Sequence, residues 1–349
     1  MIRQHGNGIA KEVLIQALGF IRMLHLRDSD PSKWAWLLSF MSHLEERNKN
    51  KDFREKVDDI LNVLSLLGIP NIDTTLVGHL NGIMATNAMH MDPTGQAFFP
   101  HLCLASHSCI PSCEHWLLGT TAMVRAKRRI KKGEELTIRY TYTSLHGDLL
   151  RDVINDAWMF SCSCERCSDS TELGTFASSF SCSHCSEGFI KKSEHYSQED
   201  YYNCSACRKV MTRQEVMDKA TTLRKLELSS SDSSSIPDLI HDITKLGGHP
   251  LYHSVISLKL QFIEQICSNI TEETCSIVQD YCRDISQYLQ ILNPGVSMQA
   301  GRVLFCCSKS RLWMLQRAGT EDKIAALKER KEILKMQVMA QKMISGFVK

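Results

Sequence analysis

The sequence predicts an α+β protein, and three observations support that fold class. Apolar residues follow a helical period through much of residues 8–90 and again after residue 250. Short segments with strand-like alternation and glycine turns lie between these two helical regions. Two groups of closely spaced cysteines follow the strand segments, with a spacing that is typical of zinc ligands.

The composition is that of an ordinary globular protein. The chain has 349 residues, enough for two or three domains, with 43% hydrophobic and 23% charged residues. Its 41 basic and 39 acidic side chains give a net charge of +2, so we expect no direct contact with nucleic acid. No apolar run approaches the length that spans a membrane, so we expect no membrane partner.

The cysteines indicate a reducing compartment. There are 15 of them, no signal peptide precedes them, and seven fall in pairs or a triplet with zinc spacing. Such spacing inside the cell indicates metal binding rather than disulfides. We therefore expect an intracellular protein, located in the cytoplasm, the nucleus or both.

The N-terminal region is expected to be mostly helical. Asp30-Pro31 is a helix start signal, with proline in the first turn. A charged connector over residues 45–51 precedes another helix that ends at Gly68. Asp73 is expected to cap a further helix that runs through Leu80.

From Phe98 onward the pattern changes to strands and turns. A β-compatible segment covers residues 117–125, and residues 131–133 form a turn. Alternation then predicts one strand with four side chains on a single face: Leu136, Ile138, Tyr140 and Tyr142. A helix is expected over residues 145–158. The basic run at residues 125–132 is interpreted as a solvated edge, with contact to an acidic partner as the alternative.

The C-terminal third is predicted to be a set of helices. The serine-rich tract at residues 229–235 is interpreted as a linker. Four apolar-periodic segments follow, at residues 251–268, 274–292, 298–317 and 321–345. Their short connections favour antiparallel helix pairs.

The first candidate zinc site is a C-x-C-x-x-C run. It contributes the three thiols of Cys162, Cys164 and Cys167, one fewer than a closed tetrahedral site requires. By proximity alone the fourth ligand could be Cys103, Cys109 or Cys113. Three cysteines this close are hard to explain as core residues, because neighbouring positions of an extended segment face opposite ways.

The second candidate zinc site has the spacing of a zinc ribbon. It consists of two C-x-x-C pairs, Cys182 with Cys185 and Cys204 with Cys207. A hairpin from residues 188–190 to residues 201–202 would bring the four thiolates to one ion. Four cysteines leave no open coordination position, so the site is expected to be structural. His184 and His195 are expected at the surface.

Three segments together resemble a known enzyme family. They are the loop Ser106-His107-Ser108-Cys109-Ile110-Pro111, the run from Gly133 to Tyr140 with the sequence GEELTIRY, and the cysteine triplet. The trio is similar to the signature of SET-domain protein-lysine methyltransferases. The resemblance is greatest to the SMYD (SET and MYND) type, and within it to insect SMYD-A-like members. It selects Cys109 as the fourth ligand of the first zinc ion.

The resemblance implies a partial SET β-fold and four regions. These are a helical SET-I-like region (1–90), the C-terminal part of the SET core (91–160), a post-SET segment with the zinc-ribbon-like module of four cysteines (161–220), and a helical TPR-like domain (236–349). We recognise neither an N-terminal SET-N segment with its G-x-G loop nor a MYND finger in the sequence, and no cysteine precedes Cys103. We therefore expect a member that begins inside the SET-I region.

The resemblance also implies a methyl-transfer site that uses S-adenosyl-L-methionine. Tyr140 matches the terminal tyrosine of the SET strand and carries the catalytic role, with Tyr142 as the alternative if the register is shifted. The implied cofactor contacts are Asn81, Ser106, His107 and Phe160. Without the resemblance, Asn81 would read as a helix cap and Phe160 as an ordinary core residue. Ser106 replaces the family asparagine, and Trp158 stands where many members have a tyrosine lining the lysine channel.

Two functions follow from these observations. The first is a protein-lysine N-methyltransferase that acts on a histone or another protein. The alternative is a catalytically inactive, zinc-stabilised regulatory protein that binds partners through its C-terminal helices. A finger protein that binds DNA is disfavoured by the neutral charge and the lack of finger-type histidines.

Overall fold

The structure, a computed structural model, describes residues 11–91, 95–141, 148–185, 187–192, 201–228, 236–318 and 323–345. Within these residues it contains 13 α-helices and ten short strands, which confirms the α+β class. The chain divides into two compact units. The N-terminal unit comprises Met1–Leu104 and Val153–Ser161, and the C-terminal unit comprises Ala105–Asp152 and Cys162–Lys349.

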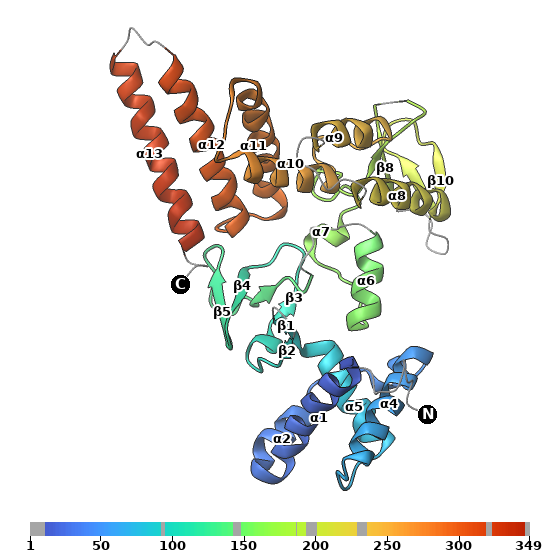
Figure 1. The fold of residues 1–349 in the computed structure, drawn as a ribbon. Helices are drawn as coiled ribbons and strands as arrows, with labels where there is room; N and C mark the ends of the chain where they lie inside the picture. The colour runs from blue at the N-terminus through green and yellow to red at the C-terminus, as the bar shows by residue number, and fades with distance from the viewer. Residues whose placement is uncertain are drawn as a thin grey trace. The chain divides into compact units, whose positions relative to one another are not determined.

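The N-terminal unit is built from helices that share one apolar core (Figure 1). Its helices and strands are α1 (Lys11–Ser29), α2 (Pro31–Leu38), α3 (Leu44–Arg47), α4 (Lys51–Leu66), α5 (Thr74–Asn87), β1 (Met89–Met91) and β2 (Gly95–Ala97). The short 3-10 helix Leu102–Leu104 follows. Phe20, Ile60 and Leu80 are among the core side chains, and each is almost fully buried. Arg47 is also buried and donates to the carbonyl of Ala157, which ties α3 to α6 (Asp148–Trp158).

Capping side chains set the helix starts that the sequence predicts. Asp30 accepts a hydrogen bond from the Lys33 amide, and Pro31 is the first residue of α2. Asp73 caps α5 by accepting from the Leu76 amide. The helix continues to Asn87, so the predicted end at Leu80 was wrong. Ile83, which is fully buried, continues the apolar face of the helix beyond Leu80.

The C-terminal unit begins with two short strand pairs. β3 (Ser106–His107) pairs in parallel with β6 (Thr137–Ile138), and β4 (Cys113–Leu118) pairs in antiparallel fashion with β5 (Thr121–Ala126). The β-compatible segment predicted at residues 117–125 is thus a hairpin that turns at Gly119, which has a φ of 56°. The turn predicted at residues 131–133 is present, with Gly133 at a φ of 87°.

The single strand predicted for residues 136–142 is much shorter in the structure. Only Thr137 and Ile138 pair as strand, and Leu136 is 54% exposed whereas Ile138 is 1% exposed. The predicted common face was therefore wrong for these two side chains. The ladder ends because the Tyr140 amide donates to the His107 side chain at 3.1 Å instead of to a neighbouring strand. Tyr142 lies outside the described residues.

The basic run at residues 125–132 is not simply a solvated edge. Lys127 is 3% exposed, and its Nζ donates to the side-chain oxygen of Asn293. Arg125 donates to the Met343 carbonyl at 3.1 Å and faces Glu114 at 3.7 Å. Arg125 of β5 and Lys127, which follows the strand, both contact residues of the C-terminal helical region. The predicted solvent exposure was therefore wrong for Lys127.

The zinc-ribbon region folds as a four-stranded antiparallel sheet in the order β10-β9-β8-β7. Its strands are β7 (Phe180–Ser181), β8 (Phe189–Lys192), β9 (Tyr201–Cys204) and β10 (Val210–Thr212), and the short helix α7 (Glu165–Ser168) precedes them. The predicted hairpin between the two C-x-x-C pairs is β8 with β9. Ile190 and Tyr202 form its small core. His184 is exposed as expected, and His195 lies outside the described residues.

The C-terminal helices form the largest core of the chain. They are α8 (Arg213–Leu228), α9 (Ile236–Lys245), α10 (His253–Ile266), α11 (Glu272–Leu292), α12 (Met298–Arg317) and α13 (Lys323–Ser345). Figure 1 shows α12 and α13 side by side as long neighbours. The last four helices agree with the predicted segments to within a few residues. The serine-rich tract lies outside the described residues, and no helix of the described chain has the length and apolar character needed to cross a membrane.

Candidate functional site

The loop that carries Cys109 is held against β6 by reciprocal hydrogen bonds. The Ser112 amide donates to the Thr137 hydroxyl, and the Thr137 amide donates to the Ser112 hydroxyl, both at 2.9 Å. The Ser108 amide also donates to the Ile138 carbonyl at 3.0 Å. These bonds fix the backbone on both sides of Cys109, whose side chain is 1% exposed. The thiol is therefore preorganised in a defined position.

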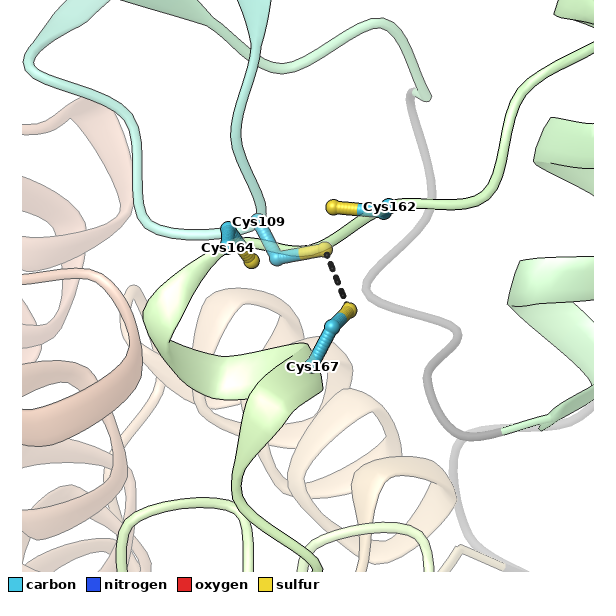
Figure 2. A group of neighbouring side chains, drawn as sticks. All are labelled: Cys109, Cys162, Cys164 and Cys167. Carbon is cyan, nitrogen blue, oxygen red and sulfur yellow. Dashed lines mark hydrogen bonds between the residues drawn. The ribbon is translucent and has the colours of Figure 1, made fainter. Parts of the chain in front are cut away.

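The structure brings Cys109 to the cysteine triplet. The sulfur atoms of Cys109, Cys162, Cys164 and Cys167 all lie within 4.8 Å of one another. Figure 2 shows the four side chains converging on one point, with Cys164 just before the short α7 and Cys167 within it. The Cys109 and Cys167 sulfurs are 3.6 Å apart, close to the separation of about 3.8 Å that Zn–S bonds of 2.3 Å give in a tetrahedron.

The two other cysteines considered for this position make different contacts. Cys113 is the first residue of β4, and its sulfur accepts from the Ser112 hydroxyl at 3.8 Å. The Cys103 thiol donates to the Asn87 carbonyl at 3.1 Å. Neither belongs to a group of candidate metal ligands among the described residues.

The protonation chemistry of this cluster fits a divalent cation. Hydrogen bonds from the neighbouring thiols, first from Cys109, lower the pKa of Cys162. Hydrogen bonds with the other three thiols raise the pKa of Cys109 far above its usual range, and the bond with Cys162 has the largest effect. Without a cation, therefore, only some of the four thiols can ionise together. A Zn²⁺ ion resolves this conflict because it stabilises all four thiolates, and four sulfur donors are the ligand set of structural zinc.

A half-buried arginine, Arg139, and a buried one, Arg166, flank the first cluster. Arg139 donates to the Cys109 carbonyl at 2.6 Å, and burial lowers its pKa. Arg166 lies between Cys164 and Cys167 in sequence and is 2% exposed. Its guanidinium donates to Glu172 at 2.8 and 3.0 Å. Burial acts to lower the pKa of Arg166, but the Glu172 carboxylate outweighs it and the pKa is raised. Because four thiolates around Zn²⁺ carry a charge of −2, nearby guanidinium groups stabilise the loaded site.

The second cluster has the same donor set. The sulfurs of Cys182, Cys185, Cys204 and Cys207 also lie within 4.8 Å of one another. Backbone amides two residues beyond Cys182 and Cys204 each donate to the cysteine sulfur at 3.4 Å. Burial acts to raise the pKa of Cys182, but backbone hydrogen bonds from Cys185 and His184 outweigh it and the pKa is lowered. At Gly188 a Cβ atom would lie only 2.4 Å from the Cys204 sulfur, so the strand entering β8 requires glycine there. This cluster fits a closed, structural zinc site.

Tyr140 and His107 are neighbours in the structure. The His107 Nδ1 accepts from the Tyr140 amide at 3.1 Å, so this nitrogen carries no proton and the ring proton of the neutral imidazole is on Nε2. Nε2 faces the Cys109 sulfur at 3.5 Å. The Tyr140 hydroxyl donates to the Ala105 carbonyl at 2.8 Å. His107 thus connects the first cysteine cluster to the segment that carries Tyr140.

The remaining predicted cofactor contacts belong to both units of the chain. Ser106 lies beside His107 in β3, and its hydroxyl donates to Glu135. Asn81 lies inside α5, so its interpretation as a helix cap was wrong. It is 5% exposed, and no hydrogen bond of its side-chain amide is present among the described residues. Phe160 is half-buried and follows α6. Asn81 and Phe160 belong to the N-terminal unit, whereas Ser106, His107 and Tyr140 belong to the C-terminal unit.

Sequence reasoning missed the charged residues around the first cluster. Arg166 could have been identified from the sequence, because a residue between two cysteines that bind one metal ion must lie close to that ion. Glu172 gave no such signal, since its pairing with Arg166 depends on a tight turn with left-handed residues at Glu172 and Leu173. The contact of Arg139 with the Cys109 loop also depends on tertiary structure.

Comparisons with known proteins give one family. A family model for the SET domain matches residues 10–141. SmydA-8 isoform A, a SET domain-containing protein of Drosophila melanogaster, is 29% identical over 176 residues, which are 47% of this chain and 38% of that protein. The histone-lysine N-methyltransferase ASHR1 of Arabidopsis thaliana is 24% identical over 319 residues, 86% of this chain and 64% of that protein. The human N-lysine methyltransferase SMYD2 is 29% identical over 151 residues, 41% of this chain and 35% of that protein. The chain spans less than two thirds of the length of each of these relatives.

Proposed function

We propose that the chain is an SMYD-type SET-domain protein and, from this premise, a protein-lysine N-methyltransferase that uses S-adenosyl-L-methionine. Residues 10–141, the segment that matches the SET domain, include Tyr140 and the loop that carries His107 and Cys109. When bound, S-adenosyl-L-methionine supplies an electrophilic methyl group. The protein must present a neutral lysine amine in line with that group, in a site from which water is excluded.

The observation that carries this proposal is the hydrogen bond of the Tyr140 hydroxyl. Its proton is directed to the Ala105 carbonyl at 2.8 Å. A phenol oxygen that donates in this way can still accept hydrogen bonds through its lone pairs. It can therefore accept an N–H of the substrate amine and turn the nitrogen lone pair toward the methyl group. Because its own proton is held by a carbonyl, Tyr140 orients the amine and does not act as a base.

The first zinc cluster would fix the position of this tyrosine. Zn²⁺ joins the Cys109 loop to residues 162–167, and His107 connects that loop to the Tyr140 amide. We assign Ser106 and His107 as cofactor contacts, and we assign Asn81 and Phe160 to the same role on the family resemblance.

The substrate class follows from the family. The relative ASHR1 is named as a histone-lysine methyltransferase and SMYD2 as an N-lysine methyltransferase. We propose a lysine of a histone or of another protein as the methyl acceptor, and the cytoplasm or nucleus as the location. We also propose that the four predicted regions act as domains and that the helices after residue 236 bind protein partners.

The proposal is tested by methyl transfer from radiolabelled S-adenosyl-L-methionine to histones and to a panel of lysine-containing proteins. The zinc-loaded wild-type chain is expected to label protein lysines. Tyr140→Phe keeps the ring but removes the hydroxyl, and misorientation of the amine should lower the rate by about 100-fold. Failure of the wild-type chain to bind S-adenosyl-L-methionine with both zinc sites filled would overturn the proposal in favour of an inactive interaction protein.

A matched control separates catalysis from folding. Tyr281→Phe removes a hydroxyl from α11, far along the chain from the SET segment, and should leave the rate unchanged. Zinc content and the unfolding midpoint of both variants should stay close to those of the wild type. If Tyr140→Phe transferred methyl groups as fast as Tyr281→Phe, the orienting role of Tyr140 would be wrong.

A further inference from the structure

A cavity in the C-terminal helices contains a pair of cysteines that the methyltransferase proposal does not use. It has a volume of about 550 Å³ and is formed by side chains of α11, α12 and α13. Cys282 of α11 and Cys307 of α12 both line it, together with Arg311 and Glu329. The cavity is large enough to admit a small polar molecule beside the two cysteines.

The two thiols have different surroundings. Cys282 is 2% exposed, and its thiol points to the Val303 carbonyl at 3.8 Å. Cys307 is only partly buried. Interaction with the Cys282 thiol lowers the pKa of Cys307 to about 7. Burial opposes this shift, and the positive charge of Arg311 adds to it. Interaction with Cys307 raises the pKa of Cys282. The pair therefore combines one thiolate-forming sulfur with one protonated neighbour.

Arg311 is held in place beside Cys307. It lies one helical turn further along α12, so its side chain is on the same face of the helix as Cys307. Its guanidinium contacts Glu329 of α13 at 2.7 and 2.9 Å. A fixed cation next to a partly exposed thiol is the environment in which cysteines react as nucleophiles.

The neighbouring pair provides a contrast within the same helix. Cys306 is 3% exposed, interacts with Cys267 and points to the Ile263 carbonyl at 3.5 Å. Cys267 is 8% exposed, and neither of these two residues lines the cavity. Adjacent residues of α12 therefore carry one sulfur that opens to the cavity and one that is enclosed in the core.

We propose that Cys307 and Cys282 form a modification site that reacts with hydroperoxides and closes to a disulfide. The Cys307 thiolate attacks the terminal peroxide oxygen, the O–O bond breaks, and the departing hydroxide or alkoxide takes up a proton. Cys307 is then a sulfenic acid. The Cys282 sulfur attacks the sulfenic sulfur, the S–O bond breaks, and the released hydroxide takes up the Cys282 proton to form water. Overall, the two thiols lose two electrons and two protons, and the hydroperoxide is reduced by two electrons. The new bond joins α11 to α12.

The test uses hydrogen peroxide with the full, zinc-loaded chain. After peroxide treatment and alkylation, mass spectrometry without reduction should find a disulfide between the segment containing Cys282 and the segment Val303–Lys309. In the untreated protein, iodoacetamide should label Cys307 at least about tenfold faster than Cys306. These measurements on the wild-type chain do not depend on the folding of a variant.

Two matched variants identify the sulfur that reacts. Cys307→Ser should abolish the disulfide, whereas Cys306→Ser should leave it in place. Arg311→Gln should slow oxidation of Cys307 by removing the adjacent cation. The proposal is overturned if the crosslink forms through Cys306 in place of Cys307, if Cys307 is labelled no faster than Cys306, or if peroxide takes Cys307 to the sulfinic acid without a crosslink. The outcome does not depend on methyltransferase activity.

Discussion

The buried ion pair next to the first zinc cluster gives the sharpest stability prediction. Arg166 and Glu172 have side chains only 2% and 10% exposed. Glu172 accepts two hydrogen bonds from the guanidinium, at 2.8 and 3.0 Å, and two more from the hydroxyl and amide of Ser178, at 3.0 and 2.6 Å. Glu172→Gln keeps the size of the side chain but removes its charge, so the buried Arg166 loses the carboxylate that pairs with it.

The expected cost is large because neither group can return to water in the folded state. Removing one partner of a buried pair typically destabilises a protein by about 3–5 kcal/mol. The loss falls on α7, which contains the proposed zinc ligand Cys167 and is capped by the proposed ligand Cys164. Glu172→Gln should therefore lower the free energy of unfolding by about this amount and speed the release of zinc from the first cluster.

The assay is urea unfolding combined with zinc release to a colorimetric chelator. Glu332→Gln is the matched control, because Glu332 forms an exposed pair with Lys335. That variant should show no measurable change, since exposed pairs contribute little. If Glu172→Gln unfolded at the same urea concentration as Glu332→Gln and released zinc at the wild-type rate, the role assigned to the buried pair would be wrong.

Three further predictions concern metal, backbone and pH. Zinc analysis should find two ions per wild-type chain and one fewer in Cys162→Ser. Gly295→Ala should destabilise the protein by at least about 2 kcal/mol in urea unfolding, because φ is 89° and the new Cβ would lie 2.3 Å from the Lys127 carbonyl. Gly119→Ala, at a φ of 56° with no atom within 4 Å, should cost only about 1 kcal/mol. Burial lowers the pKa of Lys127 to about 8 from 10.5, so its charge destabilises the folded state by about 3 kcal/mol below pH 8, and this cost should disappear as pH rises toward 10.5. The stability of the wild type relative to Lys127→Met should therefore rise over that range.

Each of these predictions has an outcome that contradicts it. Equal zinc content in Cys162→Ser and the wild type would remove Cys162 from the first site. Equal destabilisation by the two glycine variants would show that the backbone contact at Gly295 is unimportant. A difference between the wild type and Lys127→Met that does not change between pH 8 and 10.5 would mean that Lys127 is not buried as a cation.

Local sequence signals predicted the elements whose determinants lie close together in the chain. The starts of α2 and α5 follow from Asp30 and Asp73, whose side chains bond to amides three residues ahead. The ribbon hairpin follows from cysteine spacing. The four C-terminal helices follow from apolar periodicity and from Asn293-Pro294-Gly295, which interrupts it.

The features that were missed depend on partners distant in sequence. Lys127 is in a basic run that looks exposed, but it bonds to Asn293, which is 166 residues away. The strand around Ile138 is short because the Tyr140 amide bonds to a side chain 33 residues earlier. No local pattern encodes either contact. Cys109 was chosen over Cys103 and Cys113 only through the family resemblance, since spacing left all three open.

The most direct test of the central claim is isothermal titration calorimetry of S-adenosyl-L-methionine into the chain with both zinc sites filled. Saturable binding is expected at one site per chain with an affinity in the micromolar range, and weaker binding is expected after the first zinc ion is removed. An absence of binding heat at several temperatures, with zinc content and folding intact, would contradict that claim.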